Sequence, residues 1–364
     1  MIRQAKRGAV LLAGMMVLFQ VARAQQPTPT EKVTIRDKKD GAVRTYDGIL
    51  KFSAAGFQIL SSDGKVLTVV SPVDIVKVVP NDLVGVERAT LQSQVRLEDN
   101  KTRKDNEAAR LGYIDLIQKT ASAPPKTKQY LAFKKAVLST RILDESDEEE
   151  WAKQVVPVAK EWVDFLSEYK TGWEIWPAAR TCARLYIEMN KYDELTRMLK
   201  QLGAKDVELP ADLKVEAVLQ SLDAQIREGP VAYASVLKAA ESEAKNAGSG
   251  TARDKLAIYT RVAQVGENPS PEVLAAAVKD IEEKIAASKD PTVRGVGYGM
   301  IGELYLASKR PRDALWAFMW VETVYNQDKD EVLKAMVRLT QIFKGTMDEE
   351  HEKLYREKIR RFRL

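Results

Sequence analysis

The sequence predicts an α+β protein in which a small antiparallel β-structure precedes a long array of helices. Three observations lead to this prediction. Short β-branched runs separated by turn signals fill residues 33–80. From about Val84 onward, apolar residues recur with a helical period. Breaks that contain Pro or Gly then divide the chain into segments of about 12 to 20 residues, the length of ordinary helices.

The composition is that of a globular protein. The 364 residues are 45% hydrophobic and 30% charged, which excludes collagen, disordered chains and polytopic membrane proteins. Lys and Arg number 57 against 52 Asp and Glu, so the formal net charge is +5. A basic balance raises the question of nucleic acid or anionic lipid as a partner. The length suggests about two domains.

The first 24 residues have the three-part pattern of a secretory signal peptide. Basic residues precede an apolar run from Ala9 to Phe19, and small residues precede a cleavage site expected after Ala24. An uncleaved N-terminal anchor is the alternative, although the run is short for a membrane span. We therefore expect an exported protein, periplasmic or secreted in a bacterial envelope, with a polar linker over residues 25–32.

The same segment carries most of the positive charge. It holds four basic residues and no acidic one, namely Arg3, Lys6, Arg7 and Arg23. Cleavage would lower the net charge from +5 to +1, which argues against nucleic acid as a partner. No later stretch reaches the apolar length of a transmembrane helix, so no membrane span is expected after cleavage.

Residues 33–80 predict about five short strands. The expected strands are 33–35, 43–52, 57–60, 66–70 and 75–79, separated by Asp-Gly turns and short breaks. This pattern is typical of a small antiparallel barrel or sandwich, and we predict the barrel. Because so few residues can barely enclose a core, this barrel should lean on a neighbouring part of the chain.

This stretch resembles the small SH3-like or Sm-like barrels found in exported bacterial proteins. The resemblance rests on Asp40-Gly41, Asp47-Gly48-Ile49-Leu50, Asp63-Gly64-Lys65-Val66 and Pro72-Val73-Asp74-Ile75-Val76. Some barrels of this kind bind RNA or peptides. Here eight basic and six acidic residues lie between Glu31 and Lys77, too small an excess for a phosphate-binding face.

After the β-region we expect connecting helices over residues 81–125 and a helical solenoid over residues 126–364. Ser270-Pro271 and Asp290-Pro291 are helix-start signals, because each combines an N-cap side chain with Pro at the first helical position. A long series of similar antiparallel helices favours an α-solenoid over a compact bundle.

Two segments resemble the tetratricopeptide repeat. The better match combines Tyr298, Ile301, Gly302, Tyr305, Ala314 and Phe318; the other combines Ala179, Cys182, Ala183, Tyr186, Tyr192, Leu195 and Leu199. Small residues at Gly302 and Ala314 would let two helices approach, and the aromatic residues would fill the gap between them. Leu195 stands where the repeat usually has a small Ala. Tyr186 and Tyr305 are not separated by a whole number of repeats of about 34 residues, so the intervening hairpins should be irregular.

Motifs that suggest catalysis have simpler structural interpretations. Residues 297–302 match GxGxxG, but a helical segment precedes them where a dinucleotide site needs a strand, so close helix packing is preferred. The only cysteine, Cys182, is expected to be buried. The only histidine, His351, leaves too few ligands for a zinc site of the usual kind. We predict no cofactor, no metal and no enzymatic activity.

Acidic residues leave two alternatives open. The run from Glu145 to Glu150 is expected to start a helix before Trp151, where negative charge meets the positive end of the helix dipole, but it could also bind a cation. A pair of glycosidase carboxylates could lie among the 52 acidic residues without a recognisable motif.

The repeat resemblance implies a concave face that binds a partner. Arg180, Arg184 and Glu303 fall at positions facing such a groove, and two arginines four residues apart could hold a peptide carboxylate. Trp173 and Trp176 are candidates for an aromatic patch facing a ligand, with core packing as the default. Trp162, Phe165 and Tyr169 follow a buried helix stripe, and Trp316 and Trp320 are expected to pack between helices.

Together these features predict an exported, non-enzymatic binding or scaffold protein. Its helical-repeat groove would present a surface to a peptide or protein partner in a bacterial envelope. An envelope enzyme acting on glycans is the first alternative. Nucleic-acid binding through the β-region is the second, and the low charge of that region argues against it.

Overall fold

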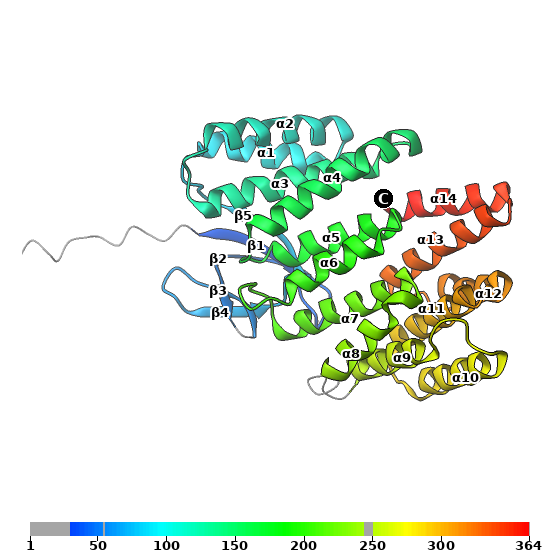
Figure 1. Cartoon of the computed structure of the whole chain (residues 1–364). Helices are drawn as coiled ribbons and strands as arrows, with labels where there is room; N and C mark the ends of the chain where they lie inside the picture. Colours follow the sequence, from blue (N-terminus) through cyan, green and yellow to red (C-terminus); the bar gives the residue numbers. More distant parts are fainter. Residues whose placement is uncertain (1–29, 54, 244–249, 364) are drawn as a thin grey trace, which may run out of the picture.

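A computed structural model describes residues 30–53, 55–243 and 250–363. Over these ranges the chain forms one five-stranded antiparallel sheet followed by fourteen α-helices (Figure 1). The predicted α+β organisation, with the sheet first and the helices after it, is confirmed. The predicted signal peptide, its cleavage site at Ala24 and most of the linker lie outside the described residues.

All five predicted strands are present, with ends within two residues of those expected. They are β1 Glu31–Arg36, β2 Val43–Ser53, β3 Gly56–Leu60, β4 Val66–Val70 and β5 Ile75–Pro80, in the spatial order β4-β3-β2-β1-β5. The long β2 joins the two halves of the sheet. Its first half pairs with β1, where Tyr46 lies opposite Val33, and its second half pairs with β3, where Leu50 lies opposite Ile59.

The predicted closed barrel is wrong, because β4 and β5 form opposite edges of an open sheet. A barrel must supply its own interior, which five short strands do poorly. Here the helices supply it instead. Val33, Ile59 and Val78 on the sheet belong to the same buried apolar cluster as Phe133 and Trp173 on the helical side. The helices are therefore the neighbouring part against which this region was expected to pack. They cover one face of the sheet and bury the apolar side chains that a closed barrel would bury in its own interior.

The helices follow one another along the rest of the chain. They are α1 Arg88–Asn100, α2 Arg103–Lys119, α3 Pro125–Asp144, α4 Glu148–Glu168, α5 Ile175–Glu188, α6 Tyr192–Leu202, α7 Ala211–Glu228, α8 Tyr233–Glu243, α9 Thr251–Val265, α10 Pro271–Ala287, α11 Pro291–Ala307, α12 Pro311–Thr323, α13 Lys329–Gly345 and α14 Glu349–Arg363. Two short 3₁₀ turns, Pro72–Asp74 and Pro230–Ala232, precede β5 and α8. Within the described ranges, no helix combines the length and apolar character that crossing a membrane requires.

The predicted helix starts are confirmed by their caps. The Ser270 side chain accepts a hydrogen bond from the Val273 backbone N–H at the start of α10. Asp290 does the same for Thr292 at the start of α11, at 2.8 Å. The acidic run also begins a helix as expected: Asp147 caps α4 by accepting from the Glu150 N–H at 2.9 Å. These caps satisfy backbone donors that the helix itself leaves free.

The helical array folds back on itself instead of extending as a simple ladder. Neighbouring helices pack as antiparallel pairs, but α13 also packs against α5 and α11 (Figure 1). The C-terminal pair α13–α14 therefore lies beside the first half of the array. This return creates the surfaces described below, because it places residues from opposite ends of the helical region together.

Glycines in α11 allow its neighbours to approach closely, as the sequence predicted. A Cβ on Gly302 would lie 2.6 Å from Cζ of the Phe318 ring on α12, and one on Gly297 would overlap the Ile285 side chain. Ala314 and Phe318 are fully buried. The glycine-rich motif is thus a packing surface inside a helix, preceded by α10 and not by a strand.

The prediction that both tryptophans of α12 pack between helices is wrong for Trp316. Its side chain is 63% exposed, and Trp320 is 46% exposed. Trp320 lies in a nearly parallel cluster with Tyr298 and Tyr325, with ring centroids 6.2 and 6.1 Å away. Both tryptophans flank Phe318 in sequence, but the helix turns only Phe318 inward.

Gly302→Ala should destabilise the protein by about 1–3 kcal/mol, because the added methyl group must displace the Phe318 ring in a filled core. Gly345→Ala is the matched control, since nothing lies within 4 Å of the Cβ it would add. It should be neutral or stabilising by up to about 1 kcal/mol, the helix-propensity difference. Urea unfolding of both variants measures the difference, and equal effects would contradict the packing role of Gly302.

Candidate functional site

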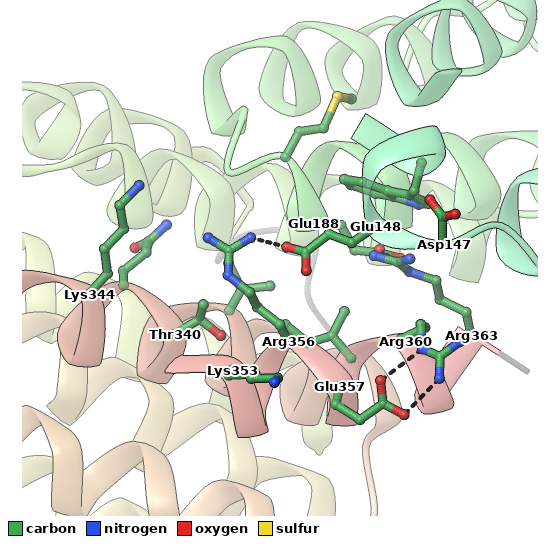
Figure 2. A pocket seen from close by; sticks show the side chains of 15 residues that line it. Asp147, Glu148, Glu188, Thr340, Lys344, Lys353, Arg356, Glu357, Arg360 and Arg363 are labelled. Carbon is green, nitrogen blue, oxygen red and sulfur yellow. Dashed lines mark hydrogen bonds and ion pairs between the residues drawn. The ribbon is translucent and has the colours of Figure 1, made fainter. Parts of the chain in front are cut away.

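A groove of about 690 Å³ lies where α13 and α14 face the start of α4 and the end of α5 (Figure 2). Its lining includes apolar side chains, among them Trp151, Met189, Val337 and Ile359. Charged side chains from all four helices surround these residues. The groove thus combines apolar surface with fixed charges, the usual composition of a binding site in a protein.

The sequence of α14 explains why this helix presents charge to the groove. Acidic residues occupy its first turn and arginines its last, which matches the helix dipole at both ends. Tyr355 and Ile359 form its buried stripe, and the Tyr355 ring stacks on Phe343 of α13 at 5.5 Å. With one stripe buried against α13, the remaining faces of α14 carry the charged side chains.

The three arginines of α14 that line the groove, Arg356, Arg360 and Arg363, all pair with carboxylates. Arg356 pairs with Glu148 of α4 and with Glu352, the latter at 2.7 Å. Arg360 pairs with Glu357 at 2.8 Å. Figure 2 shows Arg356 and Arg360 of α14 among the side chains that line the groove, together with Glu148 and Glu357. The ion pair between Arg356 of α14 and Glu148 of α4 therefore links its two walls.

Arg363 makes a further link between the walls. Its Nε donates to the Glu188 carboxylate at 2.6 Å, and its guanidinium lies 4.2 Å from the centre of the Trp151 ring. Both the Arg363 and Glu188 side chains are at least nine-tenths buried. Burial raises the pKa of Glu188, while the two nearby arginines, Arg363 and Arg184, act in the opposite direction.

Two lysines of the groove differ from the arginines. Lys344 at the end of α13 and Lys353 on α14 are exposed, and neither forms an ion pair with any described residue. They are the cations of this groove that are available to an incoming negative charge.

The predicted binding residue Arg184 lies in an internal chain of ion pairs. Its guanidinium forms a bidentate pair with Asp144 at the end of α3, with both distances 2.9 Å, and reaches Glu188 at 3.2 Å. The predicted residue Arg180 is half-exposed and contacts Asp330 at 3.3 Å, near the start of α13. The two arginines of α5 that were expected to meet a partner therefore meet other helices of the chain, with Arg184 bound to α3 and Arg180 to α13.

Glu303, the third predicted charged site residue, is buried in an ionic cluster that joins three helices. Its carboxylate binds Arg227 of α7 at 3.0 Å and Arg338 of α13 at 2.8 Å. The cluster contains three cations and three carboxylates, all at most 9% exposed: Asp223, Arg227, Glu303, Glu331, Lys334 and Arg338. Burial alone would raise the pKa of Asp223, but Arg227 and Lys334 hold it at about 2.

The two tryptophans of the predicted aromatic patch are largely buried. Trp173 and Trp176 are 9% and 3% exposed, and Trp173 packs edge-on against Phe133 at 5.3 Å. The predicted stripe on α4 is also buried at Trp162 and Phe165. Of the repeat-packing residues, Leu195, Gly302, Ala314 and Phe318 are buried, whereas Tyr186, Tyr298 and Tyr305 are partly buried.

Other reactive side chains have structural surroundings. Cys182 is fully buried, and this burial raises the pKa of its thiol to about 12. His351 is half-exposed, lies 2.9 Å from the Asp348 carboxylate and stacks on Phe343. Among the described residues, no group of three potential metal ligands comes together.

Glu303→Ala should destabilise the protein by about 3–5 kcal/mol, because it leaves Arg227 and Arg338 with unbalanced buried charge. Glu282→Ala removes an exposed carboxylate of α10 and should change stability by no more than about 0.5 kcal/mol. Chemical denaturation of the two variants provides the comparison. A small loss for Glu303→Ala would mean that this residue is free for another role.

The chain matches no model of a known protein family, and no curated protein is similar to it. The likeness to tetratricopeptide repeats therefore rests on the residues of α5–α6 and α11–α12 alone. The functional proposal rests on the geometry and charge of the groove.

Proposed function

We propose that this protein is an exported, non-enzymatic binding protein that takes a peptide segment of a partner into the groove between α4–α5 and α13–α14. The bound segment carries an acidic side chain next to an apolar one. The observation that carries this proposal is the apolar lining bordered by Lys344 and Lys353, two exposed cations without a partner among the described residues.

The apolar lining can supply most of the affinity. Burying one large apolar side chain of a peptide against Trp151, Met189 and Ile359 is worth about 1.5–3 kcal/mol. A peptide carboxylate near Lys344 or Lys353 orients the bound peptide and speeds its association with the groove. These effects are larger than its contribution to affinity. The combination selects acidic-apolar segments over purely acidic ones.

The paired arginines of the groove support binding by holding its two walls in place. They do not need to bind the partner themselves. Arg356 and Arg363 are already paired with carboxylates of the opposite wall, so the groove keeps its shape before a ligand arrives. A preorganised site loses less conformational entropy on binding. This differs from the groove implied by the repeat resemblance, since Arg184 is committed to Asp144 and Glu188.

A phage-displayed library of random linear peptides, selected on the full chain, tests the proposal. Selected peptides should share an Asp or Glu adjacent to a large apolar residue. Their synthetic versions should bind at least tenfold more weakly to the double variant Lys344→Glu, Lys353→Glu, which reverses both available charges. Fluorescence anisotropy measures the affinities.

The control is the double variant Lys238→Glu, Lys289→Glu. Both of these lysines are exposed and lie outside the groove, so the variant makes the same change in total charge. It should bind the selected peptides as the unmodified chain does. Peptides without acidic residues, or equal losses in the two double variants, would refute the proposal.

A further inference from the structure

A second cavity, of about 380 Å³, lies at the seam between the sheet and the helices. Residues of strands β1, β2, β3 and β5 form one side of it. The start of α3 and the loop that leads into α5 form the other. It lies at the junction of two structural parts, where ligand sites often occur.

Four aromatic rings line this seam cavity. Phe52 and Phe57 come from β2 and β3, and their rings meet edge-to-face at 5.4 Å. Tyr130 of α3 and Trp173 of the loop before α5 line it from the helical side. Such rings offer negatively charged faces, which attract organic cations.

Two buried carboxyl groups also line the seam cavity. Glu31, at the start of β1, is 5% exposed, and Lys126 on α3 reaches it at 2.5 Å. Glu174, just before α5, is 8% exposed. Among the described residues, Glu174 forms no ion pair, and the one side chain that donates to it is Gln129, at 3.3 Å. Burying a carboxyl group with so few hydrogen bonds costs free energy, and a ligand that pairs with Glu174 would lower that cost.

In the loop before α5, Gly172 leaves space for the carboxyl group of Glu174. Gly172 has a φ of +99°, and a Cβ there would lie 2.6 Å from Oε2 of Glu174 and 2.7 Å from Nε2 of Gln129. Any larger residue would therefore collide with the two groups and would be strained in its backbone. The glycine keeps Glu174 in its buried position.

The charge around the seam cavity is negative. The acidic residues Glu31, Glu174 and Glu208 line it, whereas Lys126 is its one basic lining residue. Lys126 is two-thirds exposed and pairs with Glu31. A ligand that enters can therefore supply the missing positive charge.

We propose that the seam cavity binds a small ligand with a protonated amine, whose ammonium group is held by Glu174 and Glu31 and whose remaining part packs on the aromatic rings. This site is separate from the peptide groove, and either proposal can fail without affecting the other. Its ligand class follows from two carboxyl groups and four rings around one small volume.

The titration of Glu174 supports the proposal. Burial, followed by the nearby Glu31, raises the pKa of Glu174 to about 7, while Lys126 lowers it. Tyr130 on α3 and Glu208 before α7 complete the titratable groups that line the cavity. An ammonium group binds the ionised carboxylate, so amine affinity should fall as pH drops below about 7.

Isothermal titration of the full chain with benzylamine tests the site, and benzyl alcohol is the neutral probe of nearly the same shape. At pH 8 benzylamine should bind at least tenfold more tightly than benzyl alcohol. Quenching or enhancement of tryptophan fluorescence gives a second readout, because Trp173 lines the cavity. Absence of saturable benzylamine binding, or equal binding of both probes, would overturn the proposal.

Two substitutions should act in opposite directions. Glu174→Gln should weaken benzylamine binding at least tenfold and abolish its dependence on pH between 6 and 8. Lys126→Gln should strengthen binding several-fold, because it frees Glu31 from its present partner. Glu282→Gln, which removes an exposed carboxylate of α10 outside the cavity, should change nothing. An unchanged affinity in Glu174→Gln, or a weaker one in Lys126→Gln, would refute the site.

Discussion

The ionic cluster around Arg227 is the constraint on which the arrangement of the helices depends. Removing a charge from water costs several kcal/mol unless partners surround it in good geometry. Arg227 meets Asp223 within its own helix, Glu303 on α11 and Glu331 on α13. Since each partner comes from a different helix, these charges are balanced only when α7, α11 and α13 lie together in one register.

This constraint connects the packing of the array with its groove. Gly299 faces Arg227 and Glu331, and a Cβ there would lie 3.2 Å from both. The glycine helix α11 therefore accommodates the cluster as well as the Phe318 ring. Once α13 is fixed by the cluster, it rests on α5 and carries α14 to the start of α4. The groove is thus a consequence of charge pairing in the interior.

Local features were predictable from the sequence because neighbouring residues determine them. The strands, the caps at Ser270 and Asp290, and the close packing at Gly302 all follow from short-range patterns. Closure of the sheet was not predictable in this way, because it depends on whether a distant helix, here carrying Phe133, covers one face.

Most of the candidate groove could not be predicted from the sequence either, because it depends on contacts between residues that are far apart in the chain. Arg184 and Glu303 were recognised as important charges, but their partners decide their role, and Arg227 lies 76 residues from Glu303. The local signals of the cluster were two pairs spaced for contact on one helix, Asp223 with Arg227 on α7 and Glu331 with Lys334 on α13. No local pattern marks Lys344 and Lys353 as the charges left without partners.

The pairing of Glu188 with Arg363 has a consequence for the assembly of the groove. These residues are 175 positions apart, so the ribosome makes the first wall of the groove long before the second. Without α14, Glu188 would lose its Arg363 partner, Trp151 would lose the guanidinium 4.2 Å from its ring, and the groove would lack one of its walls. The groove that we propose as a peptide site is therefore complete only when the C-terminal helices are in place.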